Sequence, residues 1–199
     1  EHDRGLGAPG NRARALQTLE TGLGLGLRGM IFHVVTHQNL HSRGLAELIE
    51  YTRRRGVLLV LGWAVPAGNW NDNDRVLLTD EDLLHLESIH ERFPHVRTDF
   101  ETNYVHWGCG AGKEKLYITC YGDVMPCAFV HIKFGNIFEE SLEDIRARAM
   151  KIDWFREYNG RCLAATDPEF LEKHMSRIRD AEKEPIPLEE AGFDLSDSD

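Results

Sequence analysis

Residues 116–127 read LYITCYGDVMPC, two short runs of strand-forming residues separated by a turn. The first run alternates between apolar and polar side chains, and Gly122 supplies the backbone freedom that a tight turn requires. After the return strand, Pro126 cannot donate a hydrogen bond to a continuing ladder. The pattern therefore predicts a β-hairpin that ends just before Cys127.

Two further cysteines lie at a distance from this hairpin in the sequence. Cys109 stands in a glycine-rich stretch, with twelve residues between it and Gly122, and Cys162 follows Cys127 after thirty-four intervening residues. Thiolates bind soft or borderline metals, and an iron–sulfur cluster must be held from several directions. Glycines beside Cys109 let the backbone come close to such a bulky group. The spacing indicates a metal site built from three segments.

The composition excludes several other classes of function. The chain has 199 residues and a net charge of −10, which argues against a nucleic-acid-binding surface. No apolar run approaches the length of a membrane span, and no secretory signal is visible. Four cysteines in such a chain favour reduced thiols over a disulfide framework. We therefore expect a cytoplasmic protein that binds neither nucleic acid nor membrane.

The first half of the chain alternates between helical and extended patterns. A helix is expected over roughly 11–21 and an apolar strand over 30–35. Asn39 closes the next loop and is expected to begin a second amphipathic helix that ends at Gly56. The continuous apolar run 57–61 is typical of a strand buried on both faces of a parallel sheet. This alternation predicts βα units.

The hairpin and its cysteines resemble the auxiliary-cluster domain of radical S-adenosylmethionine (SAM) enzymes, called SPASM or, in its shorter form, Twitch. The resemblance continues through Gly135 and Asn136, which look like that domain's turn, and through the helix expected after Ser141. The full SPASM pattern has a second dense group of cysteines, whereas this chain has four cysteines in total. The resemblance therefore implies one auxiliary 4Fe-4S cluster.

The resemblance also implies which cysteines bind the metal. Cys109, Cys127 and Cys162 match the family's ligand positions, and Cys120 falls on the strand just before the turn. Three thiolates leave one iron open, so that iron either binds substrate or takes a fourth ligand. Candidates for that ligand are Cys120, His106 and His131. A small buried apolar role is the alternative for Cys120.

The βα units resemble the later part of a radical SAM barrel. The expected fold class is therefore α/β, the C-terminal part of a (βα) radical SAM partial barrel followed by a small α+β Twitch/SPASM domain with a β-hairpin. Residues 1–100 would form the incomplete barrel after its fourth strand, and residues 101–178 the auxiliary-cluster domain. Residues 179–199 are acidic and are expected to form a disordered tail.

Four residues near strand ends are implied to contact SAM. The backbone of Ala64, Val65 and Pro66 would face the adenine at the end of the sixth barrel strand, and Asn39 would offer a polar contact at the fifth. Asn39 has a second interpretation, because asparagine before a helical pattern is also a common N-cap.

The resemblance implies that the function belongs to an enzyme longer than this chain. The three closely spaced cysteines that bind the SAM-cleaving cluster are missing from this sequence, so we expect the chain to be the C-terminal portion of a radical SAM enzyme. Its cofactors would be the auxiliary cluster, a second 4Fe-4S cluster and SAM. A peptide or small molecule would be modified or oxidised, with electrons from a flavodoxin or ferredoxin. The alternative is a zinc-binding or metal-free interaction module.

Overall fold

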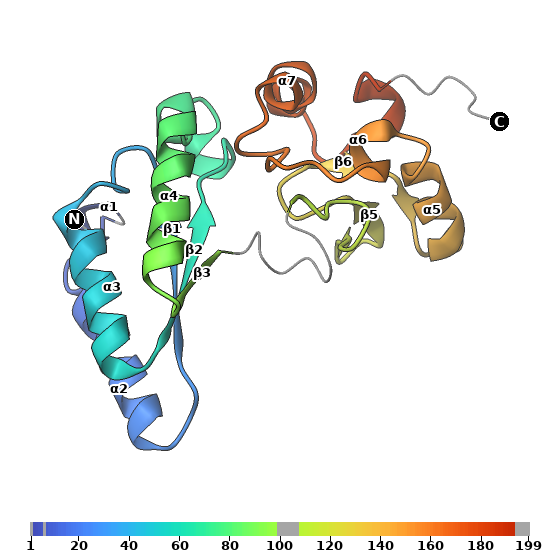
Figure 1. Cartoon of the computed structure of the whole chain (residues 1–199). Coiled ribbons are helices and arrows are strands. Elements are labelled where there is room, and N and C mark those ends of the chain that lie inside the picture. Colours follow the sequence, from blue (N-terminus) through green and yellow to red (C-terminus); the bar gives the residue numbers. More distant parts are fainter. Residues whose placement is uncertain (1, 6, 99–107, 194–199) are drawn as a thin grey trace. The chain divides into compact units, whose positions relative to one another are not determined.

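The computed structural model describes residues 2–5, 7–98 and 108–193 (Figure 1). These residues form a mixed α/β protein with helices and small sheets. They divide into two compact units. The first unit contains the residues up to Gly62 together with 80–98, and the second contains Trp63–Thr79 together with 108–193.

The first unit alternates helices and strands, as the sequence predicts. Its three strands form one sheet in the order β1-β2-β3, and β2 pairs with β3 in parallel, with Leu59 opposite Val96. The elements are α1 (His2–Gly5), α2 (Asn11–Gly24), β1 (Met30–Val35), α3 (Arg43–Arg55), β2 (Leu58–Trp63), α4 (Asp80–Arg92) and β3 (Val96–Thr98).

Alternation along the strands separates the two faces of this sheet. Leu59 and Leu61 of β2 are fully buried, as expected for side chains that pack under the buried faces of α3 and α4. Met30, Phe32 and Val34 of β1 point to the other face and are exposed. Closure of this sheet into a larger barrel stays a prediction.

The helix after β1 begins later than the sequence suggests. Ser42 is the N-cap of α3, and its side chain accepts a hydrogen bond from the Leu45 N–H. The side chain of Asn39 instead accepts from the Thr36 N–H at 2.9 Å and donates to the Val34 carbonyl at 3.0 Å. The interpretation of Asn39 as a helix N-cap was wrong, because its amide closes the preceding turn.

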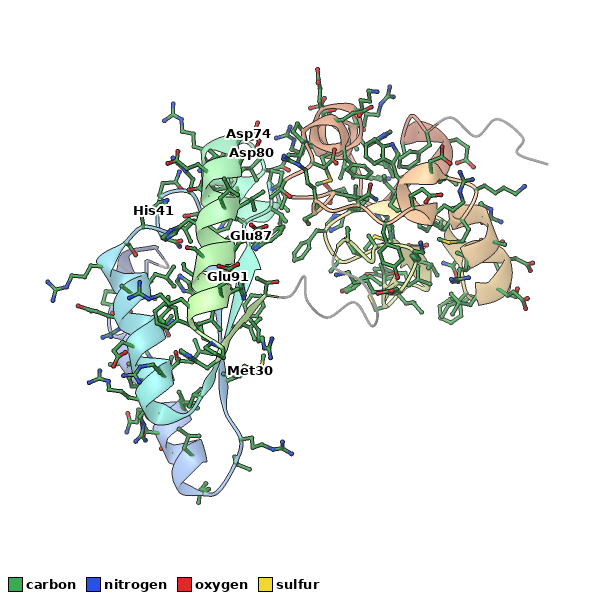
Figure 2. All side chains as sticks on the ribbon, viewed as in Figure 1. Met30, His41, Asp74, Asp80, Glu87 and Glu91 are labelled. Atoms are coloured by element: carbon green, nitrogen blue, oxygen red, sulfur yellow. The ribbon has the colours of Figure 1, made fainter. Side chains whose placement is uncertain are left out.

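A buried carboxylate joins the loop after β1 to the first turn of α4. Asp82 is 1% exposed, and its two carboxylate oxygens lie 2.8 Å from His37 Nδ1 and 3.1 Å from His41 Nε2. The His41 ring also stacks on His85, with ring centroids 4.5 Å apart. Figure 2 shows His41 near the start of α3 and Asp80 at the start of α4. The sequence alone did not suggest this cluster, since Asp82 lies 41 residues after His41.

The second unit is built from short elements around one core. Strands β4, β5 and β7 form one sheet, and β6 pairs with β8 in parallel. The strands are β4 (Tyr117–Ile118), β5 (Asp123–Met125), β6 (Ile132–Lys133), β7 (Gly135–Asn136) and β8 (Ile186–Pro187). The helices are η1 (Gly68–Trp70), η2 (Asp74–Val76), α5 (Leu142–Ala149), α6 (Asp153–Arg156), α7 (Pro168–Phe170), η3 (Leu171–Met175), α8 (Ser176–Arg179) and η4 (Leu188–Glu190).

Much of the acidic C-terminal segment is ordered. Its composition predicts a disordered tail from residue 179 onward. Instead, the segment up to Phe193 forms β8 and η4 and packs on the core. Ile186, Leu188 and Ala191 are buried. These apolar residues supply the contacts that offset the entropy of ordering the acidic residues between them. Residues 194–199 lie outside the described residues.

His174 holds this segment in place through a buried hydrogen bond. Its Nδ1 donates to the Ala191 carbonyl at 2.8 Å, and its ring lies 4.2 Å from Phe193 and 4.9 Å from Phe170 between centroids. Burial lowers the pKa of His174 below its usual value. The imidazole is therefore folded into the core in its neutral form.

The lowered pKa of His174 predicts that stability declines in acid. Below about pH 6.5 the unfolded chain binds a proton at this residue that the folded chain does not, so the free energy of unfolding falls by up to about 1.4 kcal/mol per pH unit. Above that pH both states are neutral and the contribution is constant. His174→Gln should flatten the curve just below about pH 6.5, measured by urea unfolding with tryptophan fluorescence. An unchanged slope in the variant would contradict the assignment.

None of the helices in the described ranges combines the length and the apolar character that crossing a membrane would require.

Candidate metal centre

The predicted hairpin is present. Strands β4 and β5 pair antiparallel, with Tyr117 opposite Met125 and Ile118 opposite Val124. Gly122 turns the chain with a positive φ of 84°, a conformation that favours glycine. A Cβ at this position would also lie only 2.6 Å from the Phe138 ring. The turn therefore requires glycine for both its backbone angle and its space.

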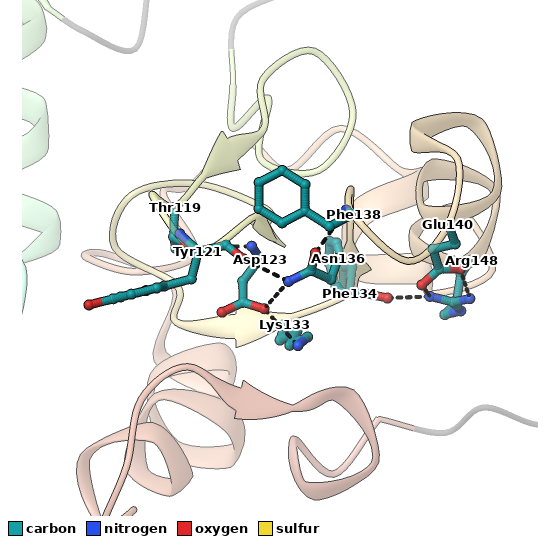
Figure 3. Close-up of polar contacts among 9 residues, drawn as sticks. All are labelled: Thr119, Tyr121, Asp123, Lys133, Phe134, Asn136, Phe138, Glu140 and Arg148. Atoms are coloured by element: carbon teal, nitrogen blue, oxygen red, sulfur yellow. Dashed lines mark hydrogen bonds and ion pairs between the residues drawn. The ribbon is translucent and has the colours of Figure 1, made fainter.

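Asn136 on β7 fastens the hairpin turn from the neighbouring strand (Figure 3). Its Nδ2 donates to the Tyr121 carbonyl at 2.9 Å and to the Asp123 carboxylate at 3.0 Å, and its Oδ1 accepts from the Phe138 N–H at 2.9 Å. Asn136 is 7% exposed, so these bonds replace water that it lost on folding. Lys133 and then Asn136 hold the pKa of Asp123 below its usual range. The predicted Gly135–Asn136 turn is thus a short strand that locks the hairpin.

Cys127 follows the end of β5, at the opposite end of that strand from the turn. The Phe129 N–H donates to its sulfur at 3.5 Å, and the Val130 N–H donates to the same sulfur. Cys127 and Val130 also form an isolated β-bridge. The tight loop after Cys127 therefore places two backbone N–H donors at the Cys127 sulfur.

Cys109 is brought to Cys162 by backbone pairing. The Cys109 N–H donates to the Asn159 carbonyl at 2.8 Å, three residues before Cys162. Gly108 adopts a φ of 135° here, and a Cβ on it would lie 2.5 Å from the same carbonyl oxygen. Cys162 itself begins a turn in which Thr166 Oγ1 accepts from the Cys162 N–H at 3.0 Å. The two cysteines are therefore positioned by different segments that pair with each other.

The thiols of Cys109, Cys127 and Cys162 interact electrostatically with one another. A hydrogen bond from the Cys162 thiol lowers the pKa of Cys109 to about 6, and the same bond, with burial, raises the pKa of Cys162. Burial raises the pKa of Cys127. One proton is thus shared between Cys109 and Cys162, so the pair readily presents a thiolate.

Backbone N–H groups surround these sulfurs. Besides the two donors at Cys127, Cys109 accepts from Leu163 and Ala111, and Cys162 accepts from Ala164. Hydrogen bonds of this kind stabilise the negative charge on cluster sulfurs and influence the reduction potential. The donor set therefore fits an iron–sulfur cluster.

No group of three histidine, cysteine, aspartate or glutamate side chains is arranged to hold a single metal ion in residues 2–5, 7–98 and 108–193. A cluster differs from a single ion in this respect, because its cysteines bind separate iron atoms.

Cys120 lies apart from the three buried or half-buried thiols. It is exposed in the turn between β4 and β5, whereas Cys127 follows the far end of β5. At about 3.3 Å per residue, the four steps along the chain from Asp123 to Cys127 span on the order of 10 Å. The structure thus does not bring Cys120 together with the other three.

The remaining predicted ligands are placed differently. His131 faces the Glu184 carboxylate through Nδ1, and its Nε2 lies 3.1 Å from the Ala128 carbonyl. His106 lies outside the described residues. Both ring nitrogens of His131 are thus already engaged with protein oxygens, and its role as a fourth ligand stays a prediction.

The residues predicted to contact SAM follow two strands of the fold. Ala64, Val65 and Pro66 come directly after β2 and are buried, and the Val65 carbonyl accepts from the Ala67 N–H at 2.9 Å. Asn39 follows β1 in the loop that its own side chain closes. Their contact with SAM stays a prediction.

Comparison with known families identifies the domain that holds the cysteines. Residues 109–166 match the family model of SPASM, described as an iron-sulfur cluster-binding domain. The chain therefore contains a SPASM domain, and the resemblance predicted from the hairpin is confirmed. The match begins at Cys109 and includes Cys127 and Cys162. A search of curated proteins found no match.

Proposed function

We propose that this chain is the auxiliary-cluster portion of a radical SAM enzyme and binds one 4Fe-4S cluster through Cys109, Cys127 and Cys162. The observation that carries the proposal is the hydrogen bond between the Cys109 and Cys162 thiols inside the SPASM match, with Cys127 interacting electrostatically with both. Each of the three sulfurs also accepts from the backbone. Three cysteines leave one coordination position for a substrate atom or another ligand. Cys120 stays a candidate for it, although reaching the site would require the hairpin turn to rearrange.

The residues of the chain would do three things in this function. The hairpin, held at its turn by Asn136, positions β5, the strand that leads to Cys127. Buried side chains beside the cysteines, such as Val124, Ala164 and Phe155, keep water away. The backbone donors hold negative charge on the sulfurs. When bound, a cluster of this kind supplies one-electron redox chemistry or an iron atom that binds a substrate.

The complete enzyme would modify or oxidise a peptide or a small molecule by radical chemistry. SAM and a second 4Fe-4S cluster would supply the radical, with Asn39, Ala64, Val65 and Pro66 as SAM contacts. A flavodoxin or ferredoxin in the cytoplasm would deliver electrons. The resemblance of the βα units to a radical SAM barrel, and the free thiols, support this larger assignment.

Anaerobic reconstitution of the chain with iron and sulfide tests the proposal. We expect a broad absorbance in the visible range and about four iron atoms per chain. Metal analysis after purification from iron- and zinc-supplemented medium gives a second readout. One zinc per chain without iron would overturn the proposal in favour of a tetrahedral structural site. Absence of both metals would favour a metal-free interaction module.

A further inference from the structure

The loop that follows Cys109 folds back on itself and ends at Lys115. The Lys115 N–H donates to the Gly110 carbonyl at 3.1 Å, and the Lys115 carbonyl accepts from the Gly112 N–H at 3.0 Å. Residues Ala111 and Lys115 also form an isolated parallel bridge. These bonds fix the backbone of Lys115 against the segment that carries Cys109.

The same loop is bonded to the segment that carries Cys127. The Gly112 N–H also donates to the carbonyl of Pro126, the residue before Cys127, at 2.8 Å. Ala111, the bridge partner of Lys115, donates its N–H to the Cys109 sulfur. The positive charge of Lys115 interacts electrostatically with the sulfurs of both cysteines.

A second lysine in this loop is used differently. The Lys113 Nζ donates to the Arg156 carbonyl at 2.6 Å and lies 3.9 Å from the centroid of the Tyr158 ring. Lys113 therefore stabilises the contact between this loop and the segment before Cys162. It carries the same charge as Lys115, two residues away, which makes it a matched control.

We propose that Lys115 raises the reduction potential of the auxiliary cluster bound by Cys109 and Cys127. This inference rests on the proposed function. Reduction adds one electron to the cluster and makes the site more negative by one charge, and no bond is formed or broken in the protein. A nearby ammonium stabilises the reduced form more than the oxidised form, so it favours uptake of the electron.

The test is a potentiometric titration of the reconstituted chain, with dithionite as reductant and visible absorbance and EPR as readouts. Lys115→Gln should lower the ratio of reduced to oxidised cluster at a fixed potential by about threefold, or about 30 mV for one electron. Lys115→Glu should lower it further, and Lys115→Arg should keep the wild-type value. Because Lys115 is exposed, the differences should shrink as salt rises from about 0.01 to 1 M.

The Lys113→Gln control distinguishes the effect of the Lys115 charge from the effect of a structural change in the loop. Lys113→Gln removes an equal charge and should shift the potential less than Lys115→Gln does. Equal potentials in wild type, Lys115→Gln and Lys115→Glu, with normal iron content, would overturn this inference and leave the proposed function standing. A shift that persists undiminished at high salt would also overturn it, because a structural change would then be the cause. Failure of the wild-type chain to take up iron would overturn the proposed function and this inference with it.

Discussion

Replacing Cys127 with serine is expected to reduce the iron content of the reconstituted chain at least about tenfold, because a serine hydroxyl stays protonated and is a poor ligand for iron. Cys109→Ser and Cys162→Ser should have the same effect, since each of the three sulfurs comes from a separate segment. Iron and sulfide analysis and visible absorbance measure the result. Far-UV circular dichroism of the metal-free variants checks that each one folds.

Cys120→Ser is the matched control for these replacements. It makes the same chemical change at an exposed thiol in the hairpin turn. We expect its iron content and absorbance to equal those of the wild-type chain. If Cys120→Ser loses iron as the others do, Cys120 is a fourth ligand and the turn must rearrange around the cluster. If Cys127→Ser keeps its iron, the ligand set proposed here is wrong.

The part of the fold that could be predicted depends on contacts between neighbours in sequence. Alternation and one glycine defined the hairpin, and apolar periodicity located β1 within the exact bounds Met30–Val35. The cysteine spacing also led to the SPASM domain, which the family match confirms. Local patterns of this kind work because turn geometry and strand alternation need only a few adjacent residues.

What the sequence did not reveal depends on contacts between distant residues. Asp82 meets His37 and His41 across more than forty positions, and no spacing rule connects an aspartate in a helix to histidines in an earlier loop. The prediction that the C-terminal segment is disordered was wrong up to Phe193 for a related reason. It rested on the acidic composition, whereas three apolar residues of the segment are buried in a core that is formed by distant parts of the chain.

The candidate metal centre also has a part that the sequence predicted and a part that it did not. The thiols could be identified from their spacing, but the pairing of Cys109 with Asn159 and the backbone donors at the sulfurs come from loop conformation. The electrostatic interaction of Lys115 with two of the sulfurs likewise depends on a loop that folds back after Cys109. Tertiary structure therefore supplies the electrostatic environment of a site whose ligands are visible in the sequence.

Asn136→Ala is expected to destabilise the metal-free chain by about 2–4 kcal/mol, because it removes three part-buried hydrogen bonds worth about 1 kcal/mol each. The Tyr121 carbonyl and the Asp123 carboxylate lose a donor, and the Phe138 N–H loses an acceptor. Asn136→Asp should also destabilise, since it removes the two donated bonds and places a second carboxylate beside Asp123. Urea unfolding measures both variants.

Asn69→Ala is the control, since Asn69 is exposed and a surface substitution of this kind changes stability by less than about 0.5 kcal/mol. A change below that value in Asn136→Ala would contradict the role of Asn136 as the lock of the hairpin. The comparison with Cys127→Ser then distinguishes the contribution of the hairpin to stability from its contribution to iron binding. The cysteine variant should unfold like the wild type without metal and fail to bind iron. The asparagine variant keeps every ligand, so any loss of iron that it shows must come from the loosened hairpin.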